Sequence, residues 1–322
     1  MMRWMTWARR ALLPACAGLL AIAALWGGTA AAASARGAAA AASPPVPLLW
    51  KVDGKGGTLY LLGSFHLLKP DDYPLSPDVL QAFAQADRLT FELPPADVQS
   101  PELAAKMLRA ARRSDGKRLQ DALDGPTWQA LATQARKHGI PLESLQPMKP
   151  WFVALTLSLA EMRRQGMQAD AGLDNYLMQL AQARGKPADG LERADEQIAL
   201  LDSMTATEQQ QLLAETLDEA GAADQVNALH DAWRRGDVHL LTTHMAEDMR
   251  KQYPALYQDI NVERNARWVP RLEQRLGKQA GTTLVVVGAL HLLGHDGVVE
   301  RLRARGYRVE RICTACAEQA GH

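Results

Sequence analysis

Hydrophobic and turn-forming residues alternate in blocks just after position 47. The apolar run Leu48–Val52 is followed by the turn residues Asp53–Gly57 and by a second apolar run, Thr58–Leu62. Two short apolar runs on either side of a glycine-rich turn are typical of a β-hairpin. The second run leads into Gly63-Ser64-Phe65-His66. We therefore expect His66 to lie at the carboxyl end of a strand.

A helix and another strand are predicted next. Ser76 is expected as the N-cap and Pro77 as the first helical residue, because serine accepts hydrogen bonds from unpaired N–H groups and proline has no N–H to leave unpaired. Apolar residues within Val79–Ala84 share one helical face. The run Arg88–Leu93, stopped by Pro94, is typical of a short strand. These elements predict a strand–helix–strand unit, as in parallel α/β sheets.

The pattern becomes helical from about residue 100 to 250 and then returns to strands. Thr205 and Glu208 have the spacing of a capping box at a helix start. The uninterrupted apolar run Thr282–Val287 predicts a buried strand, because a strand covered on both faces shows little polar alternation. This strand leads into Gly288-Ala289-Leu290-His291.

The last part of the chain resembles the first unit. Val298–Arg305 has an amphipathic helical pattern, Gly306 is expected to end that helix, and Tyr307–Ile312 is predicted as the final strand. Both units contain an apolar strand, then Gly-x-x-His and then two leucines. We predict one α/β domain over residues 48–318, with a central mixed sheet from two similar units and a helical insertion at about 100–250.

The N-terminal residues have a different character. Three arginines precede the apolar stretch Ala11–Trp26 and the small residues that end at Ala33, which is the arrangement of a secretory signal peptide. An uncleaved membrane anchor is the alternative, although this stretch is shorter than the roughly 20 residues that a bilayer span needs. We expect a signal peptide over residues 1–33, a flexible leader over 34–47, a periplasmic or secreted location, and no stable membrane span in the mature chain.

Charge and cysteine content narrow the classes of function. Lys plus Arg equals Asp plus Glu at 36 each, so we expect no basic surface for nucleic acid. Cys313 and Cys316 lie near the C-terminus, where they are expected either to form a small disulfide in an oxidising compartment or to be idle thiols. A thioredoxin-like motif would begin a helix early in a βαβ unit, and a zinc site would need two more ligands nearby.

The two histidines that follow strands are the first candidates for chemistry. His66 and His291 each follow a glycine, Gly63 and Gly288, at the same spacing. Ligands of open α/β sheets bind at the carboxyl ends of strands, and glycine lets a backbone or ligand approach closely. The imidazoles would converge if the two strands are neighbours. The alternative is that each histidine is merely hydrogen-bonded at its own strand end.

Glu92 adds a carboxylate at the end of the next strand. It lies between Phe91 and Leu93, where an unpaired charge would be costly. Two imidazoles and a carboxylate are a typical ligand set for a divalent metal with an open position, and zinc, manganese and cobalt are the candidates. The alternative is an exposed carboxylate at the sheet edge beside Pro94.

These motifs, taken in order, resemble the TraB/GumN family, which is related to the Wnt-cleaving TIKI proteases and more distantly to erythromycin esterases. The resemblance covers about residues 48–309. The segments that carry it are Gly63-Ser64-Phe65-His66, the strand with Glu92, Lys149-Pro150-Trp151, Gly172-Leu173-Asp174-Asn175-Tyr176-Leu177, Leu191-Glu192 with Asp195-Glu196-Gln197, Glu263-Arg264-Asn265, and Gly288-Ala289-Leu290-His291. It implies that His66, Glu92 and His291 correspond to TIKI residues proposed for metal-dependent peptide hydrolysis.

Arg264 is a further candidate catalytic residue, and three more residues are expected to support the site. Arg264 could hold a substrate carboxylate or stabilise an oxyanion; alternatively it forms a buried ion pair with Glu263, Asp174 or Glu192. Asp174 and Glu192 are expected to orient other groups rather than to bind metal, and Asn265 is grouped with them. The other histidines are expected elsewhere: His138 at a helix end, and His230, His239, His244 and His295 at the surface.

The sequence leaves three functions open. The first is a metal-dependent hydrolase of peptide or amide bonds, in which Glu92 binds the metal or acts as the general base. The second is a metal-independent hydrolase similar to the erythromycin esterases, with a histidine that activates water. The third is a non-catalytic protein that binds and sequesters a peptide. In each case the partner is a peptide or small molecule, and the sequence does not indicate an oligomeric state.

Overall fold

The computed structural model describes residues 43–218, 222–277 and 281–319. The signal peptide predicted over residues 1–33 lies outside these residues, as does the predicted leader over 34–42. The remainder of that leader is not free: Pro45 and Pro47 are buried, and the backbone N–H of Val46 donates to the carbonyl of Arg234 at 2.7 Å. The packed chain therefore begins ahead of Leu48.

Six strands form one mixed sheet, which together with the helices confirms the predicted α/β class. The strands are β1 (Leu49–Asp53), β2 (Gly57–Ser64), β3 (Arg88–Phe91), β4 (Ala188–Gly190), β5 (Gly281–Gly288) and β6 (Arg308–Ile312). Their order across the sheet is β4-β3-β5-β2-β1-β6. β1 and β2 form the predicted antiparallel hairpin, and β6 pairs antiparallel with β1 at the edge.

β5 is inserted between two strands that are close in sequence. It pairs in parallel with β2, where Ser64 lies opposite Gly288, and with β3, where Phe91 lies opposite Val286. The connection from β2 to β3 therefore crosses β5, and the connection from β5 to β6 crosses β2 and β1. Leu284–Val287 are at most 1% exposed, which confirms the prediction of a buried strand. The two strand–helix–strand units interleave rather than lie side by side.

Helices surround the sheet and form a large part of the remaining chain. They are α2 (Pro77–Gln85), α3 (Pro95–Val98), α4 (Pro101–Ala111), α5 (Gly125–Lys137), α6 (Leu142–Leu145), α7 (Pro150–Arg164), α8 (Leu173–Ala183), α9 (Ala194–Asp202), α10 (Ala206–Leu217), α11 (Ala222–Arg234), α12 (Val238–Leu241), α13 (Asp248–Gln252), α14 (Pro254–Tyr257), α15 (Arg264–Gly277), α16 (Val298–Arg303) and α17 (Thr314–Gln319). Short 3₁₀ helices are η3 (Pro70–Asp72), η4 (Leu119–Ala122) and η7 (Ala289–Leu292), and π-helical segments are η5 (Thr242–Glu247) and η6 (Gln258–Glu263).

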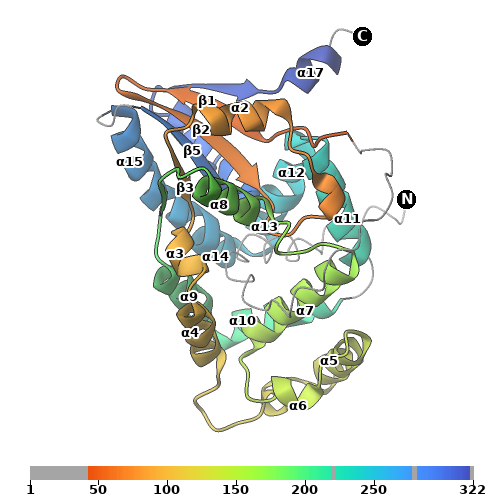
Figure 1. The fold of residues 1–322 in the computed structure, drawn as a ribbon. Helices are drawn as coiled ribbons and strands as arrows, with labels where there is room; N and C mark the ends of the chain where they lie inside the picture. The colour runs from red at the N-terminus through yellow and green to blue at the C-terminus, as the bar shows by residue number, and fades with distance from the viewer. Residues whose placement is uncertain (1–42, 219–221, 278–280, 320–322) are drawn as a thin grey trace.

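The sheet and the helical middle segment share one hydrophobic interior. Figure 1 shows the sheet in the upper part of the molecule and α4–α7 with α10 in the lower part. Buried apolar residues of both parts form one continuous cluster from Leu48 to Val309. Within the described part of the chain, no helix has both the length and the apolar composition required to cross a bilayer.

The predicted helix starts have the expected side-chain caps. Ser76 Oγ accepts from the Val79 N–H at 3.4 Å at the start of α2, and Thr205 and Glu208 form the capping box of α10. Gly306 has φ = 85° after α16, a backbone conformation that favours glycine.

The edge strand β4 and the π-helical segments were not predicted. β4 has the sequence Ala-Asp-Gly, which has none of the β-branched or aromatic residues that mark a strand. The apolar spacing of a π-helical segment differs from that of an α-helix by no more than a residue. The hydrophobic pattern therefore cannot distinguish the two kinds of helix.

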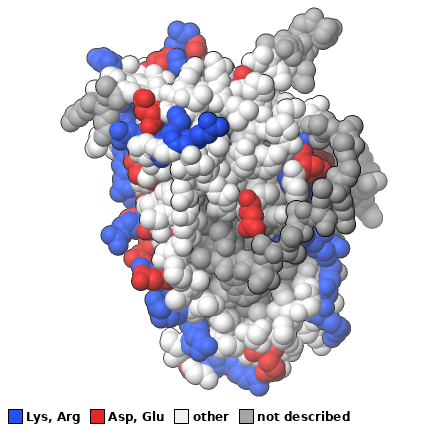
Figure 2. All heavy atoms as spheres, viewed as in Figure 1, with Lys and Arg blue, Asp and Glu red and all other residues white. Residues whose placement is uncertain are grey.

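The C-terminal segment is fixed to α2. Thr314 donates from its backbone N–H and its hydroxyl to Asp78, at 2.8 and 2.6 Å. Cys313 and Cys316 are joined by a disulfide, the first of the two states expected from the sequence. On the face in Figure 2, Lys and Arg side chains are interspersed with Asp and Glu, in keeping with their equal numbers.

Candidate functional site

Three of the predicted residues meet at the carboxyl ends of neighbouring strands. His66 follows β2 by two residues, Glu92 comes directly after β3, and His291 lies in η7, which continues from β5. The Nε2 atom of each histidine is 3.9 Å from Glu92 Oε1, so the two Nε2 atoms lie within about 8 Å of each other. The prediction that the strands before the two histidines are neighbours is confirmed.

Each imidazole is held through its Nδ1 atom. His66 Nδ1 lies 2.7 Å from Asp174 Oδ2, and His291 Nδ1 lies 2.8 Å from Asn265 Oδ1. Asn265 Nδ2 donates to Asn261 Oδ1 and to the Asp296 carbonyl, which leaves its Oδ1 as the acceptor and makes His291 Nδ1 the donor. Both histidines therefore have Nδ1 engaged and Nε2 on the side of Glu92.

Asp174 is brought to His66 by the start of α8. The backbone N–H of Leu173 donates to the Phe65 carbonyl at 3.1 Å, and a Cβ on Gly172 would lie 2.0 Å from the His66 carbonyl oxygen. Glycine is therefore required for this close approach. Burial raises the pKa of Asp174, but the charge of His66 and the hydrogen bonds from His66 and Ser64 outweigh it, so the pKa is lowered. Asp174 is therefore held against the Nδ1 side of His66.

Arg264 lies at the centre of the group and is 1% exposed. It follows the π-helical segment η6, in which the regular pairing of the backbone is widened, and its Nη1 donates to the Ile260 carbonyl at 3.2 Å. Its guanidinium forms hydrogen bonds with both Glu92 and Glu192, including one of 2.6 Å from Nη2 to Glu92 Oε2. Burial lowers the pKa of Arg264, but the charges of Glu192 and Glu92 raise it by a larger amount. The pKa of Arg264 is therefore raised overall.

The Arg264 partners decide between the alternatives left open for it. Glu192 and Glu92 form ion pairs with Arg264. The other two candidates have different partners: Asp174 contacts His66, and Glu263 Oε2 lies 3.9 Å from Arg267 Nη1. Arg264 also donates from Nη1 to His291 Nε2 at 3.0 Å. It thus forms a buried ion-pair network and at the same time contacts a predicted site histidine.

Glu92 is buried rather than exposed at the sheet edge. It is 2% exposed, and its Oε1 accepts from the Gly288 N–H at 2.7 Å. The exposed-edge alternative for Glu92 is therefore wrong. The pairing of β4 with β3 extends to the residues after both strands. There the Glu192 N–H donates to the Glu92 carbonyl at 3.0 Å, which sets the two carboxyl groups beside each other.

His291 is held in its neutral form. Burial, the charge of Arg264 and the nearby His66 all lower its pKa well below the usual 6.5. The neutral ring has Nδ1–H toward Asn265 and accepts at Nε2 from Arg264. Trp268, one helical turn after Arg264, packs over the His291 ring with centroids 4.4 Å apart.

The two glycines predicted as site residues serve different purposes. A Cβ on Gly288 would lie 3.1 Å from Glu92 Oε1 and 3.5 Å from His66 Nε2, inside the space that these groups face. A Cβ on Gly63 would instead meet the Leu48 side chain at 3.1 Å and the Ala289 backbone at 3.3 Å. Gly288 belongs to the site, and Gly63 is a packing position of the hairpin.

Two buried side chains of the site were not singled out from the sequence. Trp268 Nε1 donates to Glu192 Oε2 at 3.3 Å, and Gln197 Nε2 donates to Glu192 Oε1 at 2.7 Å and to Glu92 Oε2 at 3.3 Å. Trp268 could have been found from its spacing of four residues from Arg264, which puts both on one helical face. Gln197 lies within a segment of the family resemblance, but no pattern indicated that its side chain turns inward.

One histidine prediction is wrong. His230 is 2% exposed rather than at the surface, and its Nε2 lies 2.7 Å from Asp72 Oδ2. Asp72 also accepts from the Lys69 N–H at 2.7 Å and from Arg234, so this buried group ties α11 to η3. The helical pattern around His230 is polar, but a carboxylate from a distant segment covers the ring. His138 is at the C-cap of α5 as predicted, and His295 is exposed.

The side chains that face Glu92 Oε1 meet some of the needs of a divalent metal. Ligand bonds of about 2.1 Å allow two ligands of one ion to be up to about 4.2 Å apart, so the 3.9 Å separations from both Nε2 atoms are within reach. Two carboxyl groups, those of Glu92 and Glu192, bind the single guanidinium of Arg264 here, and a cation would offset the remaining negative charge. However, His291 Nε2 accepts from Arg264, and among the described residues no cluster of three His, Cys, Asp or Glu side chains is arranged to hold an ion. His66 and Glu92 fit directly, and His291 fits once Arg264 gives up that contact.

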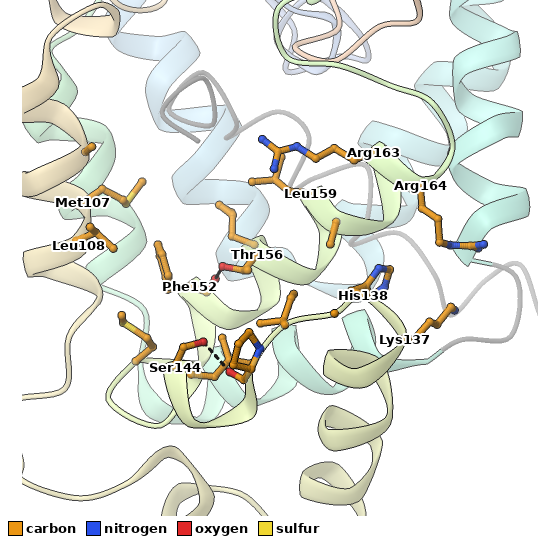
Figure 3. Close-up of a pocket in the computed structure, with 18 residues that line it drawn as sticks. Met107, Leu108, Lys137, His138, Ser144, Phe152, Thr156, Leu159, Arg163 and Arg164 are labelled. Carbon is orange, nitrogen blue, oxygen red and sulfur yellow. Dashed lines mark hydrogen bonds between the residues drawn. The ribbon is translucent and has the colours of Figure 1, made fainter. Parts of the chain in front are cut away.

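A separate cavity of about 720 Å³ lies between α4, α5, α6 and α7. Its wall is mostly apolar, with Met107, Leu108 and Phe152 on one side and Lys137, Arg163 and Arg164 on the other (Figure 3). None of the strand-end residues lines it. This cavity is therefore distinct from the group around Glu92.

The fold and the site define a class of protein: an α/β protein with two histidines, a glutamate and an arginine gathered at the ends of three adjacent strands. Residues 48–311 match the sequence model of the TraB/PrgY/gumN family, and the chain belongs to this family. No solved structure gave a significant match to this chain.

Curated relatives are similar over most of the chain. The uncharacterized protein YbaP of Escherichia coli (strain K12) is 28% identical over 252 residues, which are 76% of this chain and 87% of YbaP. An uncharacterized protein of Treponema pallidum (strain Nichols) is 23% identical over 278 residues, 80% of each chain. Metalloprotease TIKI1 of Danio rerio is 24% identical over 305 residues, which are 78% of this chain and 60% of TIKI1.

Proposed function

We propose that this protein is a metal-dependent hydrolase of peptide or amide bonds, with its reaction centre at His66, Glu92 and His291. One observation carries the proposal: both histidines are fixed at Nδ1, and both have Nε2 3.9 Å from the same carboxylate oxygen. Carboxylate or carbonyl partners on the far nitrogen are typical of metal-binding histidines. The similarity to a relative named as a metalloprotease supports the same function.

His66, Glu92 and His291 would hold zinc, manganese or cobalt. When bound, such an ion polarises a carbonyl and lowers the pKa of a bound water. The other residues of the chain have their own tasks. Asp174 and Asn265 keep the imidazoles oriented, and Arg264 keeps the buried carboxylates compensated and supplies positive charge beside the reacting bond. Gly288 leaves open the space where the groups converge.

Substitution of the histidines tests this proposal. Wild-type protein should bind about one divalent ion per chain, and a chelator should abolish its cleavage of a peptide library, with recovery on addition of zinc, manganese or cobalt. His66→Ala and His291→Ala should lose both properties and remain folded. His295→Ala is the matched control, because that side chain is 68% exposed four residues after His291, and it should behave as wild type. Wild-type protein that binds none of the three metals at micromolar concentration contradicts the proposal.

A metal-independent hydrolase is the second candidate, and one contact favours it. Arg264 Nη1 donates to His291 Nε2 at 3.0 Å and thereby occupies the nitrogen that a metal would need. In this case His66 acts as the general base: Nε2 takes a proton from water while Asp174 holds Nδ1–H. Peptide cleavage that survives complete removal of metal, and that His66→Ala abolishes, would establish this candidate. Binding of peptides without any cleavage would instead identify a sequestering protein.

A further inference from the structure

The cavity between α4, α5, α6 and α7 has the size of a small-molecule site and reaches the surface. Its volume is about 720 Å³, within the range of roughly 300–1,000 Å³ that is usual for ligand pockets. Lys137 and Arg163 of its wall are exposed, and so is Leu108, one of the large hydrophobic side chains that the described part of the chain presents to solvent. A molecule in solution can therefore enter this space.

One face of α7 forms a side of the cavity. The lining residues of this helix begin at Phe152 and follow at the i+3, i+4, i+7 and i+8 positions of one helical face, and they end with Arg163 and Arg164. From Phe152 to Ala160 this face is apolar apart from Thr156, and the two arginines belong to the last turn. The helix therefore gives the cavity an apolar stretch that ends in positive charge.

The hydroxyl groups of the wall are already hydrogen-bonded within the protein. Thr156 Oγ1 donates to the Phe152 carbonyl at 2.8 Å, and Ser144 Oγ donates to the Pro141 carbonyl at 2.6 Å. Among the described lining residues these are the only hydroxyl side chains. A peptide in this space would bring backbone N–H and carbonyl groups that an apolar wall cannot pair, and burial of unpaired polar groups is costly. A hydrocarbon chain has no such groups.

The charged part of the wall is cationic. Lys137 at the end of α5 and Arg163 and Arg164 at the end of α7 lie away from Leu108 (Figure 3). Glu161, which does not line the cavity, accepts from Arg164 Nε and Nη2 at 3.1 and 2.9 Å and holds that guanidinium in place. None of the described lining residues is Asp or Glu. This end of the cavity therefore favours an anion, and guanidinium and ammonium groups bind a carboxylate through charge-assisted hydrogen bonds.

We infer that this cavity binds a long-chain fatty acid. Its hydrocarbon chain lies along the apolar face of α7, and its carboxylate lies at Lys137, Arg163 and Arg164. The apolar wall selects the chain, and the cationic end selects the head group and fixes the direction in which the molecule enters. The inference is independent of the proposed hydrolase, because none of the strand-end residues lines the cavity.

A titration of saturated fatty acids into lipid-free wild-type protein tests the inference. Calorimetry with decanoic, dodecanoic and tetradecanoic acid, each below its micelle concentration, should show one molecule bound per chain. Each added methylene should lower the dissociation constant about fourfold, the change expected for burial of one methylene group. The primary alcohol of the same length should bind about tenfold more weakly than the acid, because it cannot form the charge-assisted hydrogen bonds.

Substitutions at the two ends of the cavity locate the site. Ala160 is half-buried in the wall, so the ring of Ala160→Phe occupies the cavity and should abolish binding of both the acid and the alcohol. Lys137→Gln and Arg163→Gln together should weaken binding of the acid about tenfold and leave the alcohol unchanged. Arg136→Gln is the matched control, because Arg136 is the exposed neighbour of Lys137 and does not line the cavity. It should bind both compounds as the wild type does.

Three results overturn the inference. The first is that wild-type protein binds none of the acids, and the second is that it binds acid and alcohol equally. The third is that the double variant Lys137→Gln, Arg163→Gln retains the full preference for the acid, since the anion then lies elsewhere. Both of these positions are exposed, so this last comparison decides even if Ala160→Phe does not fold. Full binding by a folded Ala160→Phe overturns the inference as well.

Discussion

Gly288 leaves no side chain at the point where Glu92, His66 and His291 face one another. Its backbone angles, φ −51° and ψ 139°, are open to any residue, so glycine is not required there by conformation. Its N–H donates to Glu92 Oε1 at 2.7 Å, and a Cβ would lie 3.1 Å from that same oxygen. The position therefore needs glycine for the space beside Glu92.

Gly288→Ala should reduce hydrolysis and metal binding at least tenfold while costing only about 1–3 kcal/mol of unfolding free energy, the range for slight overpacking. The added methyl forces Glu92 or His66 away from the shared space. Metal titration and urea unfolding measure the two effects. Gly125→Ala is the control, because a Cβ at the start of α5 meets nothing within 4 Å, and both quantities should be unchanged. Full metal binding by Gly288→Ala would place the reaction centre elsewhere.

Asp72 is a second buried carboxylate, remote from the strand ends. It is 0% exposed and binds Lys69 N–H, His230 and Arg234. Burial raises the pKa of Asp72, but these three partners together lower it by a larger amount. The native-state pKa therefore lies below the usual 3.8. A carboxyl group with a lowered native pKa contributes stability that is complete above its unfolded-state pKa and is lost as pH falls through its native pKa.

Asp72→Asn should lower the free energy of unfolding at pH 7 by about 3–5 kcal/mol, because it leaves His230 and Arg234 without their anion. The variant should also lose part of the decline in stability below pH 3.8 that the wild type shows. Urea unfolding from pH 2 to 7 measures both changes. Asp71→Asn, at the exposed neighbouring position, should stay within about 0.5 kcal/mol of wild type. An acid limb that is the same in Asp72→Asn and wild type would assign the acid sensitivity to other carboxylates.

Residues that follow predictable strands were placed well from the sequence. His66, Glu92 and His291 each lie at or within three residues of the end of a strand, and the ends of parallel neighbours meet at one edge. Residues that reach the site from helices were harder. The family resemblance contains Arg264, a candidate catalytic residue, and Asp174 and Glu192, two expected supports, but the pairing of Arg264 with both glutamates depends on how the helices dock. His230 was misplaced for the same reason, because Asp72 lies 158 residues away.

At the scale of elements, the short edge strand β4 controls the position of Glu192. β4 pairs in parallel with β3, with Gly190 opposite Phe91, and Glu192 follows two residues later. A Cβ on Gly190 would lie 2.4 Å from Pro94 N and Cδ. Close packing of β4 on the Pro94 turn thus sets Glu192 against Arg264.

Gly190→Ala should push β4 away from Pro94 and displace Glu192 from Arg264. We expect a loss of about 1–3 kcal/mol of unfolding free energy, together with a fall in activity, since a buried guanidinium loses part of its compensation. Gly277→Ala is the control: it lies at the end of α15, where a Cβ meets nothing within 4 Å, and alanine should be neutral or slightly stabilising. Urea unfolding and peptide cleavage give the comparison. Equal activity of Gly190→Ala and wild type would separate β4 from the site.

Some helices and strands are predicted more clearly by the local sequence than others. The hairpin, β5 and the caps at Ser76 and Thr205 follow from local rules, because alternation, apolar runs and capping side chains are visible within a few residues. β4 was missed because Ala-Asp-Gly has no strand pattern of its own. It is a strand because its backbone pairs with that of β3. The π-helical segment before Arg264 was missed because its apolar spacing does not distinguish it from an α-helix.

At the scale of the whole molecule, the α/β class was predictable, whereas the order of the strands was not. The similarity of the two Gly-x-x-His units suggested that they lie together, and β2 and β5 are adjacent. Nothing in the local pattern indicates that β5 enters between β2 and β3, since both connections are compatible with several sheet orders. The helical part is joined to the sheet by the continuous apolar cluster, a contact that periodicity alone cannot assign.

The insertion of β5 between β2 and β3 has a consequence for the newborn chain. During translation His66 and Glu92 are synthesised early. Arg264, β5 and the His291 that follows β5 are synthesised much later. Until then β2 and β3 have no strand between them, and contacts of this sequence separation form slowly. The group around Glu92 therefore cannot assemble until β5 has docked between β2 and β3. A fragment that ends before Gly281 lacks both β5 and His291 and therefore cannot form the group around Glu92.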